Sequence, residues 1–190
     1  MLQLRLPTDA DWADFVLADF DNFLRDHAGC ERKASATAMS LVGHYPDRTE
    51  LVEAMLEVAL EELDHFRRVY EILKSRGGAL APDVKDPYVA ELRTQLSRGT
   101  NRFFLDRLLI SGIIEARSAE RLGLIARALG DGPMREFYQE LTRCEAKHHA
   151  VFVRLAECYY PSDVVRPRLA ELLDFEASVL ARLPRRVAVH

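Results

Sequence analysis

The sequence is poor in the residue types that break helices or cross-link small domains. Its 190 residues include only nine glycines, eight prolines and three cysteines. The cysteines (Cys30, Cys144 and Cys158) cannot all pair with one another and match no zinc-binding spacing. They therefore argue against a disulfide-rich secreted scaffold and favour a reducing, cytoplasmic location. No dinucleotide-binding or flavin motif is visible, so a redox reaction would need electrons from outside the chain.

Long apolar runs are missing as well. No uninterrupted apolar stretch approaches the roughly 18–20 residues that span a bilayer. The first residues, MLQLRLPTDADW, carry one arginine and then turn acidic, which is not the pattern of a secretory signal. We therefore expect no membrane association. The length suits one domain with a substantial core, which we expect to cover 1–190.

Positive charge is concentrated in one part of an otherwise acidic chain. The formal net charge is −4, yet residues 66–107 hold nine Lys or Arg against five Asp or Glu. Such a segment can attract a polyanion, although charge alone favours the simpler interpretation of solvated helix faces. The cations concerned are Arg67, Arg68, Lys74, Arg76, Lys85, Arg93, Arg98, Arg102 and Arg107.

The spacing of apolar residues predicts helices throughout, and no stretch alternates for long enough to be a strand. We expect an all-α fold, a four-helix bundle with additional short flanking helices and brief connections. The bundle core is expected over about 26–160, followed by a C-terminal helix over about 164–183. The four long helices are expected over about 26–44, 47–76, 101–129 and 133–160.

Two of the long helices contain the motif Glu-x-x-His. It is formed by Glu62 and His65 in EELDHF and by Glu145 and His148 in CEAKHH. Side chains at positions i and i+3 leave the same face of a helix, so each pair can reach one metal ion. In both helices the pair interrupts an otherwise apolar stripe, which predicts that these polar groups lie on the buried face.

The other two long helices each carry one Glu in a similar stripe. Glu31 precedes Glu62 by 31 residues, and Glu115 precedes Glu145 by 30 residues. The chain therefore consists of two helix pairs, each with one Glu followed by Glu-x-x-His, in a pseudo-repeat with little other identity.

Four ionised carboxylates inside a bundle need a counter-charge. Each would cost several kcal/mol to desolvate, and the four would repel one another. Two divalent cations neutralise them, with both histidines bound as neutral imidazoles. The pattern matches the di-iron and di-manganese carboxylate bundles, and its ligand types leave the choice between iron and manganese open. The competing interpretation is that the acids are surface residues or partners of Arg32, Arg117, Arg121 or Arg143.

Several longer strings resemble the MiaE family of tRNA hydroxylases, and the resemblance covers roughly 8–160. Carried over residue by residue, the family's metal ligands would be Glu31, Glu62, His65, Glu115, Glu145 and His148. No departure from the family pattern is visible at these positions. The strings are HAGCERKASATAM (27–39), HYPDRTELV (44–52), EELDHF (61–66), KDPY (85–88), DRLLISGIIEARSAERL (106–122) and CEAKHHAVF (144–152).

The resemblance implies a ferritin-like, non-haem di-iron monooxygenase with two iron ions, dioxygen as co-substrate and an external electron donor. The implied substrate is 2-methylthio-N6-isopentenyladenosine, the modified adenosine beside the tRNA anticodon, which is hydroxylated on its isopentenyl group. The partners would be tRNA and an electron-donating reductase, in the cytoplasm. No catalytic residue beyond the metal ligands is expected, and no site for an organic cofactor.

Two alternatives stay open at this point. The same bundle could be a ferroxidase or a manganese catalase, which would leave the basic segment unexplained. It could also be a structural or iron-binding bundle whose metals only stabilise the fold, without oxygen consumption.

Overall fold

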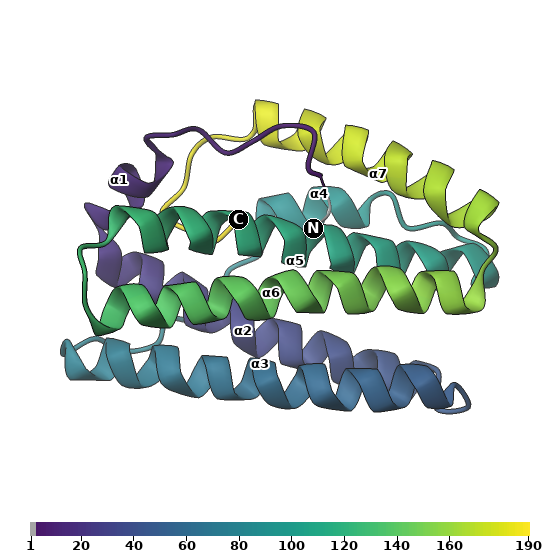
Figure 1. Cartoon of the computed structure of the whole chain (residues 1–190), viewed down its shortest axis with the longest axis horizontal. Coiled ribbons are helices and arrows are strands. Elements are labelled where there is room, and N and C mark those ends of the chain that lie inside the picture. The colour runs from purple at the N-terminus through teal and green to yellow at the C-terminus, as the bar shows by residue number, and fades with distance from the viewer. Residues whose placement is uncertain (1–2) are drawn as a thin grey trace. The chain divides into compact units, whose positions relative to one another are not determined.

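The computed structural model describes residues 3–190. Over this range the chain forms seven α-helices and no β-strand, which confirms the all-α prediction (Figure 1). It divides into an α2–α3 unit (residues 14–84 and 186–189) and an α4–α7 unit (described residues 3–13, 85–185 and 190). The helices are α1 (Trp12–Leu17), α2 (Phe20–His44), α3 (Thr49–Ser75), α4 (Pro87–Arg93), α5 (Thr100–Ala128), α6 (Pro133–Tyr159) and α7 (Ser162–Arg182).

In the α2–α3 unit the two long helices lie side by side (Figure 1). Leu24 and Leu41 of α2 and Leu51 and Leu73 of α3 are fully buried, as their apolar spacing predicts. The hydroxyl of Ser35 donates a hydrogen bond of 2.8 Å from α2 to the carbonyl oxygen of Ala59 on α3. The two helices are therefore joined by buried apolar side chains and by at least one hydrogen bond.

The end of α3 depends on a glycine. Gly77 has a φ of 78°, in the left-handed region that other residues enter only at a cost. The backbone N–H of Gly77 donates to the carbonyl of Lys74 (3.0 Å), and that of Gly78 donates to the carbonyl of Leu73 (2.9 Å). These bonds satisfy carbonyl groups that the last helical turn leaves open, so the helix ends where Gly77-Gly78 predicts.

In the α4–α7 unit, α5 and α6 lie side by side, and α7 packs on α4, α5 and α6 (Figure 1). The two long helices approach closely at Gly112. A Cβ atom there would lie 3.3 Å from the Cβ of Phe152 and 3.5 Å from the carbonyl oxygen of His149. A larger residue at this position would therefore push α6 away from α5.

A buried ion pair connects α5 to α7 inside the α4–α7 unit. The guanidinium of Arg117 donates to Glu176 Oε1 from Nε (3.0 Å) and from Nη2 (2.7 Å), and both side chains are 0% exposed. The hydroxyl of Tyr88 on α4 donates to the same oxygen at 3.0 Å. Burial lowers the pKa of Arg117, but the carboxylates of Glu176 and Glu120 outweigh burial and raise that pKa above its ordinary value. Arg117 is therefore a cation at neutral pH.

The segment before α1 is joined to the same pair. The backbone N–H and the hydroxyl of Thr8 donate to the carboxylate of Glu120 at 2.9 Å and 2.7 Å, and Glu120 is also paired with Arg117. Arg117 Nη2 donates to the carbonyl oxygen of Leu6 at 2.8 Å. The guanidinium of Arg121 lies 5.0 Å from the ring centroid of Trp12, and burial lowers its pKa to about 10. Residues 6–12 are thus held on α5 by charged groups.

Within residues 3–190, none of the helices combines the length and the apolar content that crossing a bilayer requires. The C-terminal helix expected at 164–183 is present as α7, and α1 and α4 are short helices that flank the long ones, as expected. The single domain over 1–190 and the bundle core over 26–160 stay predictions.

Removing the charge of Glu176 should destabilise the fold strongly, because it leaves the guanidinium of Arg117 buried without its main counter-charge. We expect Glu176→Gln to lower the free energy of unfolding by about 3–5 kcal/mol. Urea denaturation of the metal-free protein, followed by circular dichroism, measures the change.

The matched control is Asp174→Asn, also on α7, which removes a carboxylate that is 71% exposed and paired with Arg5. This change should cost at most about 1 kcal/mol, because water screens an exposed ion pair. Equal losses of stability in the two variants would contradict the special role of the buried pair.

Candidate metal centre

The α2–α3 unit brings together three of the predicted ligands, which we call the α2–α3 trio: Glu31, Glu62 and His65. All three are buried. Nδ1 of His65 lies 3.5 Å from Glu31 Oε2 and 3.8 Å from Glu62 Oε2. One ligand atom from each residue lies within 4.8 Å of the others, which is close enough for a single ion to contact all three. The neighbouring Glu61 is exposed, and only Glu62 has the i, i+3 relation to His65 that places both side chains on the same helix face.

His27 contacts this trio one helical turn before Glu31. Its Nε2 lies 2.6 Å from Glu31 Oε1, and its side chain is fully buried. A hydrogen bond of this length fixes the orientation of the Glu31 carboxylate. The i, i+4 spacing left two roles open for His27, a hydrogen bond to Glu31 or simple packing, and the structure shows the hydrogen bond.

The α4–α7 unit brings together the other three predicted ligands, which we call the α5–α6 trio: Glu115, Glu145 and His148. They are buried too. Nδ1 of His148 lies 3.7 Å from Glu145 Oε2, and one ligand atom from each residue lies within 4.8 Å of the others. The thiol sulfur of Cys144 lies 3.7 Å from Nε2 of His148, one helical turn before it. Each unit thus repeats the same set of two carboxylates and one imidazole.

The histidine after His148 has a different environment. The side chain of His149 is buried, and burial lowers its pKa, so its ring is neutral at pH 7. No extra positive charge is therefore provided at this position.

Two of the four arginines that could have neutralised the buried acids are paired with other carboxylates. Arg32 pairs with Asp83 within the α2–α3 unit, and Arg117 pairs with Glu120 and Glu176. Arg143 is exposed. These contacts favour a metal over an arginine as the counter-charge of the buried acids.

The donor chemistry of both trios fits iron or manganese. Carboxylate oxygen and imidazole nitrogen suit these metals, whereas a thiolate-rich site would favour zinc, copper or iron–sulfur clusters. An ion held by three protein ligands would keep coordination positions open for exogenous molecules. The assignment of the six residues as metal ligands stays a prediction.

A comparison with protein families finds one match over nearly the whole chain. The model of the family described as tRNA-(MS[2]IO[6]A)-hydroxylase (MiaE) matches residues 2–190. The strings recognised in the sequence lie within this range, and the match extends past them to α7 and the residues that follow it.

Two curated relatives carry the same name, tRNA 2-(methylsulfanyl)-N(6)-isopentenyladenosine(37) hydroxylase. The relative from Pseudomonas putida is 35% identical over 156 residues, which are 82% of this chain and 76% of the relative. The relative from Salmonella typhimurium is 26% identical over 165 residues, and the matched part is 87% of this chain but only 60% of the relative. Neither of them is named as a ferroxidase or a manganese catalase.

A solved structure resembles the whole chain. It is described as protein 43 with aldehyde deformylating oxygenase activity from Synechococcus, with a TM-score of 0.93 and 36% sequence identity. The match covers 100% of this chain and 96% of that chain. This similarity confirms the expected all-α, ferritin-like fold class.

The family match, the named relatives and the likeness to an oxygenase agree with the expectation of an oxygen-dependent enzyme. They confirm the resemblance first seen in the strings around the predicted ligands. The chain belongs to the MiaE family of tRNA hydroxylases.

Proposed function

We propose that this chain is a monooxygenase that hydroxylates the isopentenyl group of 2-methylthio-N6-isopentenyladenosine in tRNA. Its membership of the MiaE family carries the proposal, since both curated relatives are named for this reaction. Two buried trios of ligand-type residues give the chain the groups that an oxygen-activating enzyme needs. Neither the family match nor the relatives support a ferroxidase or a manganese catalase.

We propose further that each trio binds one iron ion and that the two ions form one di-iron centre. Its ligands would be Glu31, Glu62 and His65 for one ion and Glu115, Glu145 and His148 for the other. Charge supports this assignment, because two divalent ions balance four carboxylates and leave a neutral cluster. The known di-iron pattern, one Glu from each of two helices and Glu-x-x-His from each of the others, is present in full.

The chain's own residues would prepare the centre for the reaction. Iron bound there would activate dioxygen with electrons from outside and oxidise a C–H bond of the substrate. His27 holds Glu31 in one orientation through its hydrogen bond of 2.6 Å. Burial of all six ligands keeps bulk water away from the reacting groups, which protects a reactive oxidant from side reactions.

The electrons require a partner, which we propose is a reductase. Hydroxylation of a C–H bond by dioxygen consumes two electrons and two protons and yields one water, and no dinucleotide or flavin motif is visible in the sequence. Because tRNA is the substrate, we also propose that the enzyme works in the cytoplasm.

We propose that the basic residues of the α4–α7 unit contact the tRNA backbone. Lys85, Arg93, Arg98 and Arg102 are exposed and form no ion pair with another described residue. In the α2–α3 unit, by contrast, Arg67 is paired with Asp64 and Glu71. Cations without an intramolecular partner are the ones available to neutralise phosphates.

Replacement of a proposed ligand should remove one metal ion without unfolding the chain. We expect Glu62→Ala to reduce bound iron from about two ions to about one per chain after anaerobic ferrous loading. The matched control is Glu57→Ala at an exposed position of the same helix, which should bind as much iron as the unaltered chain. Elemental analysis after desalting measures the ratio. Iron loss in the control but not in Glu62→Ala would contradict the ligand assignment.

The iron-loaded chain should hydroxylate tRNA that carries the modified nucleoside. With a chemical reductant and isotopically labelled dioxygen, mass spectrometry of the digested tRNA should find one labelled oxygen atom on the isopentenyl group. A reaction without dioxygen and a tRNA without the isopentenyl group are the controls. The proposed function would be overturned if the isopentenyl group carried no new hydroxyl after incubation with fully loaded protein. A product oxygen that comes from water would overturn it as well.

Charge reversal at two exposed cations should weaken tRNA binding. We expect Arg98→Glu with Arg102→Glu to lower the affinity about tenfold or more, and to reduce the salt dependence by about one unit of slope per lost phosphate contact. Fluorescence anisotropy over a series of salt concentrations measures both quantities.

The control with the same change of net charge is Arg5→Glu with Arg185→Glu, because both arginines are already paired with carboxylates. An equal loss of affinity in this control would indicate a general charge effect and would refute a specific surface.

A further inference from the structure

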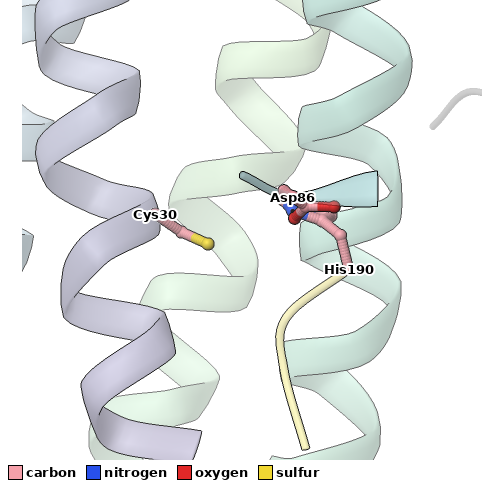
Figure 2. Close-up of side chains that lie close together, drawn as sticks. All are labelled: Cys30, Asp86 and His190. Atoms are coloured by element: carbon pink, nitrogen blue, oxygen red, sulfur yellow. Dashed lines mark ion pairs between the residues drawn. The ribbon is translucent and has the colours of Figure 1, made fainter. Parts of the chain in front are cut away.

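Three polar side chains outside the two trios form an ordered array in the α4–α7 unit. Oγ of Ser118 lies 2.9 Å from Nε2 of His190, and both side chains are buried. The other ring nitrogen of His190, Nδ1, lies 3.4 Å from Oδ2 of Asp86. Figure 2 shows Asp86 and His190 next to each other. A hydroxyl, an imidazole and a carboxylate thus lie next to one another, and the imidazole–carboxylate contact is an ion-pair distance rather than a hydrogen bond.

The imidazole in this array is fixed in place. The rings of His190 and Tyr88 are stacked, with centroids 5.3 Å apart and an interplanar angle of 9°. Asp86 is itself fixed, because its Oδ1 accepts hydrogen bonds from the backbone N–H groups of Tyr88 (2.8 Å) and Val89 (3.3 Å) at the start of α4. Its second carboxylate oxygen is therefore the one that faces His190. The geometry is set by groups that belong to the fold.

The array does not have the surroundings of a nucleophilic triad. Ser118 lies in the middle of α5, where the backbone N–H groups are used by the helix and are not free to form an oxyanion hole. Its side chain is only 7% exposed, which leaves no room for an acyl substrate to approach it. A hydroxyl and an imidazole at hydrogen-bond distance can, however, pass a proton from one to the other.

The array begins one helical turn from a proposed iron ligand. Glu115 and Ser118 are three residues apart on α5, so they leave the same face of the helix, about 4.5 Å apart along its axis. At the other end, the side chain of Asp86 is 11% exposed, and its Oδ2 is buried. The array therefore extends from a position one helical turn after Glu115 to a carboxylate that retains some contact with water.

We infer that Ser118 and His190 form a proton relay to the α5–α6 trio, with Asp86 and Tyr88 as positioning residues. This inference rests on the proposed function, because hydroxylation takes up two protons when the second oxygen atom of dioxygen leaves as water. A proton from bulk water arrives at Nδ1 of His190 beside the Asp86 carboxylate, and the Nε2 proton passes to Ser118 Oγ. Ser118 releases its own hydroxyl proton toward the trio. The ring returns to its first tautomer by proton exchange between turnovers.

The first test uses the metal-free protein. Nitrogen NMR of the histidine rings should show that Nε2 of His190 is hydrogen-bonded, and Ser118→Ala should shift this resonance while Ser118→Thr should preserve it. An unchanged Nε2 resonance in Ser118→Ala would overturn the relay. This readout does not depend on iron or on hydroxylation.

The second test measures turnover with iron bound. Ser118→Ala and His190→Ala should keep the wild-type iron content but lower the rate of hydroxylation about 10- to 100-fold, in line with the loss of a proton-transfer group. Ser118→Thr should retain most of the rate. Added imidazole should restore His190→Ala, whereas pyrrole, which has the same shape but no basic nitrogen, should not.

The outcomes separate the relay from the proposed function. If the unaltered chain hydroxylates tRNA and the variants do so at the same rate, the relay is refuted and the proposed function stands. If pyrrole restores the rate as well as imidazole, His190 only fills space. If the unaltered iron-loaded chain forms no hydroxylated nucleoside, the proposed function itself fails.

Discussion

The structure depends on the cost of burying charged side chains. Four carboxylates lie inside the two helix pairs, and a carboxylate that leaves water without a counter-charge costs several kcal/mol. A chain would not keep such residues at regularly spaced core positions unless something compensates them. In a family of hydroxylases such compensation would have an immediate use, because bound cations that neutralise the acids would also activate dioxygen.

The buried carboxylates of this fold have two kinds of neighbouring groups. Glu176 is fully buried and is neutralised by Arg117, with further hydrogen bonds that join α4, α5 and α7. This pair consists of permanently charged groups and only supports the structure. The two trios instead combine carboxylates with imidazoles, which ligate metals in their neutral form. Arginine is thus used where a fixed charge is sufficient, and ligand-type residues where we propose that iron binds.

Much of this could be predicted from local patterns in the sequence. The end of α3 followed from Gly77-Gly78 and the start of α6 from Gly132-Pro133, because both depend on the conformations of single residues. The choice of Glu62 over Glu61 followed from helix periodicity, and the two are indeed buried and exposed, respectively. These features need only information within one or two helical turns.

Contacts between distant residues could not be predicted in this way. Ser118 and His190 are 72 residues apart, and Arg117 and Glu176 are 59 apart, so no periodicity connects them. His190 follows a short basic stretch with no helical pattern, which gave no reason to expect a buried imidazole there. Such pairs are set by how α4, α5 and α7 pack, and only a three-dimensional structure contains that information.

The central claim is that both trios hold iron and that the two ions share one centre. Mössbauer spectroscopy of the oxidised chain, loaded with isotopically enriched iron, tests it most directly. Two ferric ions that share one centre would couple antiferromagnetically, so the account predicts equal amounts of two iron sites with a diamagnetic ground state in an applied field. A spectrum of magnetically isolated iron, or of one iron ion per chain at saturation, would contradict it.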